Sequence, residues 1–192
     1  VVNFLAPFKR YKSIMLNTIG YAGIIQGLNV FHVVYENSEE LTKSRYDALF
    51  ADLSYERLVN MAVSREEREV LEGRFEWINS WSSRLKILKC TPDETTIPDV
   101  MEALKREQYI SGFVPDAIVV DYLNIVAPSV KFREERLQQR KVVWDFKKMA
   151  DTYGVPLFTA SQAKVEANKV ERLDRTHMGK SIDIPQGVDI CI

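Results

Sequence analysis

Several side chains suited to phosphate and metal chemistry stand where predicted strands end or a predicted helix begins. Lys12 and Ser13 open a helix, while Glu36, Asp121 and Gln162 each follow an apolar segment. A lysine can reach phosphate oxygens, a hydroxyl and a carboxylate can hold Mg²⁺, a glutamate can polarise an attacking water, and a glutamine can contact a terminal phosphate. Each residue alone is more simply explained as a cap of the next turn. All of them together, in this order, favour a site for nucleotide chemistry.

The segment 6–13 has the layout of a phosphate-binding loop, in which a strand leads through a short loop into a helix that begins at Lys12. Backbone amides at a helix N-terminus bind phosphate, so this layout is what such a loop needs. The usual pattern carries glycine at its first and sixth positions, which here are Ala6 and Tyr11. An ordinary basic turn therefore stays open as the alternative. A nucleotide would contact Ala6, Pro7, Phe8, Lys9, Arg10, Tyr11, Lys12 and Ser13.

Apolar runs and helical periodicity predict an alternation of strands and helices. The most informative run is 117–120, Ala-Ile-Val-Val, which has no polar alternation and is typical of a strand buried on both faces of a parallel sheet. Other strands are expected at 1–5, 30–35, 85–88, 155–160 and 188–192. Helices are expected at 12–26, 97–109 and 134–153, with two or three more between 39 and 84. The alternation predicts an α/β fold with a mainly parallel sheet flanked by helices.

Two groups of aromatic and apolar residues at helical spacing are expected to face the core. In the last helix before the 85–88 strand they are Val70, Trp77, Ile78 and Trp81, with Leu85 continuing the same spacing, and we interpret them as core rather than as a nucleotide-stacking surface. In the 134–153 helix they are Val142, Phe146, Met149, Ala150 and Tyr153.

Length and charge set broad bounds on the chain. Its 192 residues correspond to a single domain, 1–192, with enough chain for a substantial core. The net charge of −1 gives no overall sign of nucleic-acid binding, so any such signal must be local. The chain begins without methionine inside one apolar run and stops inside another, which predicts a piece of a longer polypeptide.

Cysteine usage and hydropathy bear on the compartment. Cys90 and Cys191 are the only cysteines, and both are expected to be buried and reduced, as in a cytoplasmic protein. No apolar run approaches the length of a membrane span, and no signal peptide is visible.

Taken together, these segments resemble the RecA-like ATPase domain of DnaB-type replicative helicases, especially their phage branch. The most specific matches are 115–123, PDAIVVDYL, which is similar to the family's Walker B segment, and 155–162, VPLFTASQ, which is similar to its strand ending in Ser-Gln. Weaker matches are 27–38, 96–100, and Gly179-Lys180-Ser181 before Val188-Asp189. The chain departs from the family at Ala6 and Tyr11, and at Asn37, where the family has methionine; the last difference is expected to have little effect.

The resemblance implies a RecA-like P-loop NTPase fold, ATP and Mg²⁺ as cofactors, and specific roles for the candidate residues. Lys12 and Ser13 would hold the phosphates, Ser13 and Asp121 the Mg²⁺, Glu36 would activate water, and Gln162 would sense the γ-phosphate. It also implies a ring, a hexamer in the full-length protein, whose arginine finger comes from outside this chain. A primase or a helicase loader would be a further partner, and the location would be the cytoplasm, the host's if a phage encodes the protein.

Two basic segments could contact single-stranded DNA. Segment 131–148 holds seven Lys or Arg residues, and much of it is expected to be a solvated helix face. The loop 163–180 is polar, expected to be mobile, and would line the central channel of a RecA-like helicase. The DNA-binding residues predicted in it are Lys164, Lys169, Arg172, Arg175 and Lys180.

The leading hypothesis is therefore the ATPase motor of a replicative DNA helicase, which couples ATP hydrolysis to translocation and duplex unwinding. One alternative is a RecA-like module with a degenerate phosphate loop that acts non-enzymatically in assembly or DNA binding. Ala6 and Tyr11 favour this alternative. The retention of all five candidate residues favours an enzyme, since an inactive site has no need of them: Lys12, Ser13, Glu36, Asp121 and Gln162. A recombinase or regulatory ATPase of the same fold is the third possibility.

Overall fold

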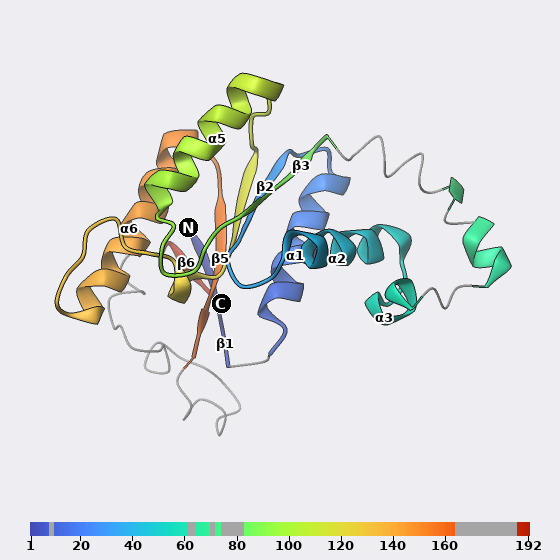
Figure 1. The fold of residues 1–192 in the computed structure, drawn as a ribbon, viewed down its shortest axis with the longest axis horizontal. Coiled ribbons are helices and arrows are strands. Elements are labelled where there is room, and N and C mark those ends of the chain that lie inside the picture. Colours follow the sequence, from blue (N-terminus) through green and yellow to red (C-terminus); the bar gives the residue numbers. More distant parts are fainter. Residues whose placement is uncertain (8–9, 61–63, 70–71, 74–82, 164–187) are drawn as a thin grey trace.

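A six-stranded sheet lies at the centre of the computed structural model, which describes residues 1–7, 10–60, 64–69, 72–73, 83–163 and 188–192 (Figure 1). The strands are β1 (Val2–Ala6), β2 (Val30–Val34), β3 (Leu85–Lys89), β4 (Ala117–Asp121), β5 (Leu157–Gln162) and β6 (Ile190–Cys191). They lie in the order β3-β2-β4-β5-β1-β6, and each of these pairings is parallel. The predicted α/β fold with a parallel sheet is confirmed.

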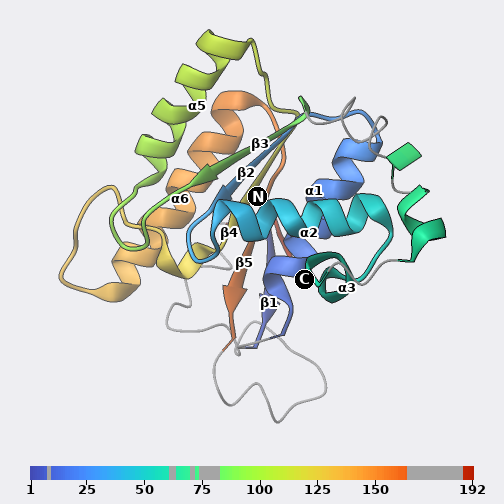
Figure 2. The same cartoon turned by 45° about the vertical axis from the view of Figure 1, so that its right-hand side comes forward.

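Helices cover both faces of the sheet, as Figures 1 and 2 show. The helices α1 (Lys12–Ile25) and α2 (Glu39–Ala51) pack on one face, and α5 (Ile97–Ser111) and α6 (Glu135–Tyr153) pack on the other. The short α3 (Tyr55–Val59) follows α2, and a 3-10 turn, η1 (Leu123–Ile125), follows β4. Among the described residues, no helix combines the length and the apolar character needed to cross a membrane.

The strand β4 is buried along its whole length, as its apolar run predicts. Ile118 and Val120 contribute to the core beneath α5 and α6, and Val119 points to the core beneath α1 and α2. Burying an aliphatic side chain of this size stabilises a fold by about 1.5–3 kcal/mol. The central strand is thus held from both sides, and its C-terminal Asp121 is placed at a rigid edge of the sheet.

Local signals in the sequence fix the ends of the helices on the second face. Thr96 and Asp99 form a reciprocal capping box at the start of α5, with Pro98 in its first turn, as predicted. The helix α6 ends at Gly154, which has a φ of 65° and adopts the left-handed conformation that glycine tolerates best. In α6 the predicted core residues Val142 and Phe146 are buried, as are Met149 and Ala150, while Tyr153 is half-buried.

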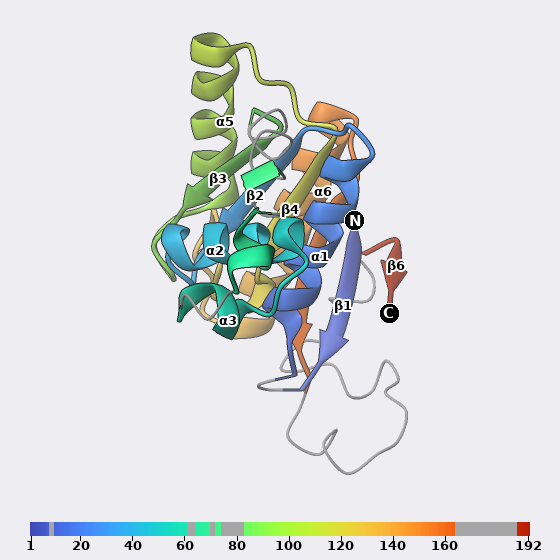
Figure 3. The same ribbon diagram turned by 90° about the vertical axis from the view of Figure 1, so that its right-hand side faces the viewer.

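Three expectations need correction or lie outside the described residues. Cys90 is buried as expected, but Cys191 is exposed, because it lies on the two-residue edge strand β6, which pairs with β1 on one side (Figure 3). The strand β5 begins at Leu157 rather than at 155, since Pro156 has no N–H to donate to a neighbouring strand. The predicted core positions Val70, Trp77, Ile78 and Trp81 lie outside the described residues.

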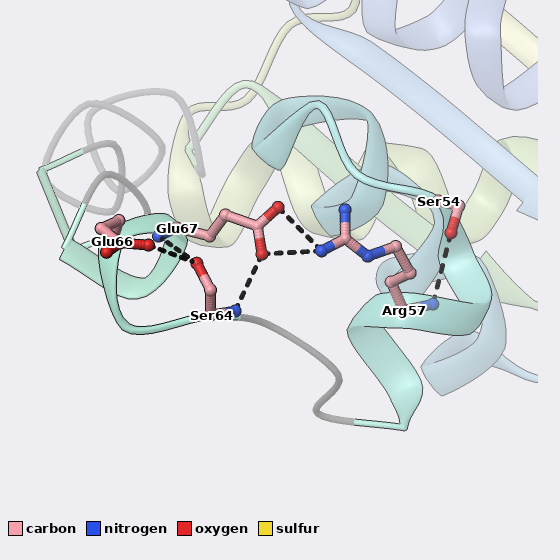
Figure 4. Close-up of polar contacts among 5 residues, drawn as sticks. All are labelled: Ser54, Arg57, Ser64, Glu66 and Glu67. Carbon is pink, nitrogen blue, oxygen red and sulfur yellow. Dashed lines mark hydrogen bonds and ion pairs between the residues drawn. The ribbon is translucent and has the colours of Figure 1, made fainter.

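Beyond α2, polar contacts join the described residues around α3 to those at 64–67 (Figure 4). Ser54 caps α3, and Arg57 from this helix makes a two-pronged ion pair with Glu67, with nitrogen–oxygen distances of 2.7 and 2.6 Å. The backbone N–H of Ser64 donates to Glu67, and the Ser64 hydroxyl donates to Glu66. These groups lie at the surface, where water and salt screen their charges, so each pair contributes little to stability.

The core beneath α1 and α2 contains a fully buried histidine, His32, in β2. Its Nδ1 lies 2.8 Å from the hydroxyl of Tyr46, which is also buried. Gly20 makes room for this pair, because a Cβ at position 20 would lie 2.0 Å from the Tyr46 hydroxyl. Burial, together with the nearby positive charge of Arg45, lowers the pKa of His32 to about 3. The imidazole is therefore neutral in the folded protein at neutral pH.

We expect His32 to make the fold sensitive to mild acid. In the unfolded chain, His32 binds a proton below its ordinary pKa of 6.5, whereas in the folded chain it stays neutral down to about pH 3. The free energy of unfolding therefore decreases as the pH falls below 6.5. Between about pH 7 and about pH 5 this linkage should cost about 2 kcal/mol. Urea unfolding of the wild type and of His32→Asn across this range measures it. An equal pH dependence in both proteins would contradict the linkage.

Candidate active site

The candidate residues meet at the C-terminal edge of the sheet, because the strands that carry them are parallel. Asp121 at the end of β4 is in register with Val34 of β2, and the N–H of Tyr35 donates to the Asp121 carbonyl over 3.0 Å. Glu36 follows directly. On the other side of β5, Ala6 at the end of β1 is in register with Gln162. This edge is where open α/β sheets bind their ligands.

The described end of the loop between β1 and α1 shows how α1 can begin without a glycine at position 11. Tyr11 is the N-cap residue of α1, with φ 56° and ψ 23°, a left-handed conformation usually adopted by glycine. Its side chain is 74% exposed, and its carbonyl accepts the N–H of Met15 over 2.9 Å. The helix therefore starts at Lys12 despite the cost of about 1–2 kcal/mol for a left-handed residue with a side chain. Phe8 and Lys9 lie outside the described residues.

Lys12 extends back over this loop. Its ammonium group donates to the carbonyl of Pro7 over 3.1 Å and lies 5.7 Å from the centre of the Tyr122 ring. Partial burial lowers the pKa of Lys12, and the negative charges of Asp121 and Glu36 oppose this shift. Lys12 thus lies in a partly dry site with two carboxylates nearby, where an anionic ligand would find a positive charge.

Asp121, Ser13 and Asn37 form a small polar cluster between β4, α1 and the end of β2. The carboxamide nitrogen of Asn37 donates to the Asp121 carboxylate over 3.1 Å and to the Ser13 hydroxyl over 3.3 Å. Burial raises the pKa of Asp121, while hydrogen bonds with Ser13 and Asn37 oppose the shift. The expectation that Asn37 has little effect does not fit these contacts.

The cluster has the donor set for a hard divalent cation that arrives with a ligand. The second carboxylate oxygen of Asp121 is buried and has no hydrogen-bond partner among the residues that the structure describes. Such an oxygen suits a cation or a cation-bound water. Within the same residues, no group of three or more His, Cys, Asp or Glu could hold a metal ion. Ser13 and Asp121 therefore fit Mg²⁺ as a small set of ligands that leaves several positions to phosphate oxygens and water.

A cavity of about 370 Å³ opens beside this cluster. It is lined by Arg10, Tyr11, Lys12, Ser13, Ile14, Glu36, Arg45 and Tyr122. The lining includes three positive side chains and the start of α1, a helix of 14 residues whose first amides lack intrahelical partners. The cavity can thus accept a polyphosphate, with the exposed carboxylate of Glu36 at its wall.

Gln162 lies at the same edge of the sheet but is not among the described residues that line the cavity. Its backbone N–H donates over 2.9 Å to the side chain of Asn124 in η1. The next N–H along the chain, that of Ala163, donates to the carbonyl of Ala6 over 3.0 Å. Gln162 is therefore tied both to the turn after β4 and to the start of the phosphate loop.

Two polar residues of the site were missed from the sequence. Arg45 lines the cavity from α2, and one nitrogen of its guanidinium is buried without a hydrogen-bond partner among the described residues. Arg45 lies seven residues, about two helical turns, after the helix cap Ser38. This spacing places both on one face of α2 and could have indicated Arg45 from the sequence. Asn37 gave no such signal, because the direction of a single side chain in a strand-to-helix loop does not follow from periodicity.

The predicted DNA-binding residues Lys164, Lys169, Arg172, Arg175 and Lys180 lie outside the described residues, as does the Gly179-Lys180-Ser181 match. One face of the helix in 134–148 is solvated, as expected, with Arg140 and Lys148 exposed, whereas Val142 and Phe146 on the other face are buried. Within it, Lys141 forms an ion pair with Asp145, and Lys147 lies 3.2 Å from Asp189.

No protein-family model and no curated protein sequence matches this chain. Solved structures, in contrast, match this chain in fold. One is a structure described as an ATPase domain, with a TM-score of 0.83 and 15% identity over 99% of this chain and 67% of that one. Another is a DnaB-like replicative helicase studied with primase, with a TM-score of 0.84 and 15% identity over 99% of this chain and 45% of that one. The chain thus spans 67% and 45% of the lengths of these two proteins. It has the RecA-like fold of the ATPase domains of DnaB-like replicative helicases.

Proposed function

We propose that the chain is the ATPase domain of a replicative DNA helicase, which couples ATP hydrolysis to movement along single-stranded DNA and duplex unwinding. The observation that carries this proposal is the meeting of Lys12, Ser13 and Asp121 beside a cavity at the C-terminal edge of a RecA-like sheet. A buried carboxylate oxygen without a described partner and a partly buried ammonium have little structural purpose in an empty site.

In this proposal each residue has a defined task. The amides at the start of α1 and the Lys12 ammonium bind the β- and γ-phosphates. Glu36 accepts a proton from the attacking water while the oxygen of this water forms a bond to the γ-phosphorus. The bond from the γ-phosphorus to the bridging oxygen breaks, and ADP and phosphate leave. Gln162 contacts the γ-phosphate and passes its presence to the segment that follows β5. Ser13 and Asp121 would hold Mg²⁺, which when bound neutralises charge on the phosphates.

The whole protein would work as a ring, a hexamer, with an arginine finger supplied from outside this chain and with a primase or a helicase loader as a further partner. The likeness to a DnaB-like helicase studied with primase supports this assembly. We place the protein in the cytoplasm, that of the host if a phage encodes it.

The non-enzymatic alternative rested on the loss of glycine at Ala6 and Tyr11. The left-handed conformation of Tyr11 lets α1 begin at Lys12, so the first amides of this helix remain available to a phosphate, which weakens this alternative. Nucleotide-independent DNA binding by a protein that binds no ATP would restore it.

We predict that single-stranded DNA binds through the segment after β5. Replacing Lys164, Lys169 and Arg172 with alanine in the full-length protein should weaken binding and flatten its salt dependence, because each lost phosphate contact lowers the slope of log affinity against log salt by about 0.7. Fluorescence anisotropy with labelled oligonucleotides over a salt series measures both quantities.

The matched control removes the same number of positive charges from the described surface, at Lys43, Lys105 and Arg106 in α2 and α5, all exposed or in exposed ion pairs. This variant should keep the wild-type salt slope. If the two triple variants bind DNA equally well, the segment after β5 is not the DNA-binding surface.

A further inference from the structure

Asn37 lies between the two groups that fit a cation. Its carboxamide nitrogen donates to the Ser13 hydroxyl over 3.3 Å and to one oxygen of the Asp121 carboxylate over 3.1 Å. Both acceptors are oxygens, and an N–H₂ group carries a partial positive charge toward them. The other oxygen of Asp121 stays buried without a described partner. One donor thus contacts both residues that would hold Mg²⁺.

We propose that Asn37 is a positioning residue whose carboxamide nitrogen takes the place of the cation between Ser13 and Asp121 in the nucleotide-free protein and is displaced when Mg²⁺ enters with nucleotide. This inference rests on the proposed function for the identity of the ligand, although the bridging position of Asn37 does not depend on it.

The displacement follows from the chemistry of the amide. An amide nitrogen donates hydrogen bonds and has no lone pair available for a metal, so it cannot share the site with a cation. When the cation arrives at these oxygens, the hydrogen bonds from Asn37 to Ser13 and Asp121 must break. Because a hydrogen bond to a carboxylate is stronger than one between neutral groups, this exchange opposes cation binding. In return, the amide adds two hydrogen bonds to the one between Ser13 and Asp121 while the site is empty.

The first test removes the donor without changing the size of the side chain. In Asn37→Leu, the affinity for ATP in EDTA should stay within about a factor of two of the wild type, because Asn37 is not among the described residues that line the cavity. The gain in affinity on adding Mg²⁺ should be about tenfold larger than in the wild type, since no amide has to be displaced. Calorimetric titrations of the full-length protein with ATP, in EDTA and in Mg²⁺, give this ratio. A ratio equal to or smaller than that of the wild type overturns the proposal.

The second test needs no nucleotide. Asn37→Asp places a carboxylate where the amide was, so two carboxylates and a hydroxyl would then surround the cation's place. Adding Mg²⁺ alone should raise the Tm of this variant by several degrees, as expected for a ligand that binds only the folded state. The control Asn60→Asp adds the same charge at the exposed C-cap of α3 and should show no such shift. Equal effects of Mg²⁺ on the two variants overturn the proposal.

The two tests separate this inference from the proposed function. If the wild type binds no ATP with or without Mg²⁺, the proposed function fails, and the comparison of Asn37→Asp with Asn60→Asp alone decides whether position 37 occupies a cation site. If Asn37→Asp does not fold without Mg²⁺, the ratio measured with Asn37→Leu decides.

Discussion

Replacing Glu36 with glutamine should reduce ATP hydrolysis by the full-length protein about 10²-fold or more, while ATP affinity stays nearly intact. Glu36 follows β2 and lies at the wall of the cavity that Lys12 and Ser13 also line. Glutamine keeps the shape of the side chain but cannot accept the proton of the attacking water. The expected loss is therefore in kcat, with little change in the binding of ATP.

The matched control is Glu40→Gln, which removes the same charge from the exposed first turn of α2, four residues farther along the chain. It should hydrolyse ATP at close to the wild-type rate. Steady-state phosphate release in the presence of single-stranded DNA measures both variants. Unchanged turnover by Glu36→Gln would remove this residue from the mechanism.

Lys12→Ala should lower the affinity for Mg²⁺-ATP about 10²-fold or more, because several charge-assisted hydrogen bonds to phosphate oxygens are lost at once. In the empty site this ammonium donates to the Pro7 carbonyl, a neutral acceptor that a phosphate oxygen can replace. A control with the same loss of charge is Lys105→Ala on the exposed side of α5. If Lys12→Ala binds Mg²⁺-ATP as tightly as Lys105→Ala, Lys12 does not face the phosphates.

The fold could be predicted from the sequence because its signals are local and agree with one another. The run at 117–120 has no polar alternation and becomes the fully buried β4. The Thr96 capping box starts α5, and Gly154 ends α6. The edge of the sheet was less predictable: the exposure of Cys191 on β6 depends on which strands lie beside it, and a short apolar run does not specify its neighbours.

The positions of the candidate site residues also followed from topology. In a parallel sheet the strand ends share one edge, so Glu36 and Asp121 were expected at the same edge. Their proximity also requires that β2 and β4 be neighbours, which the structure shows and the sequence did not specify. The conformation of Tyr11 could not be derived in this way. Glycine adopts the left-handed conformation at the lowest cost, but the surrounding structure at the start of a helix can hold another residue in it. The contacts of Asn37 depend on one side-chain torsion in a loop, which no sequence pattern specifies.

Binding of Mg²⁺-ATP to the wild-type chain is the most direct test of the proposed ATPase function. Isothermal titration calorimetry with ATP, ADP and a non-hydrolysable ATP analogue should show one site per chain, weaker than a glycine-containing loop would give. Mg²⁺ should strengthen binding, and Lys12→Ala should reduce it below detection. No detectable binding of any of these nucleotides by the wild-type chain, repeated with the full-length protein, would contradict the account and favour a non-enzymatic RecA-like module.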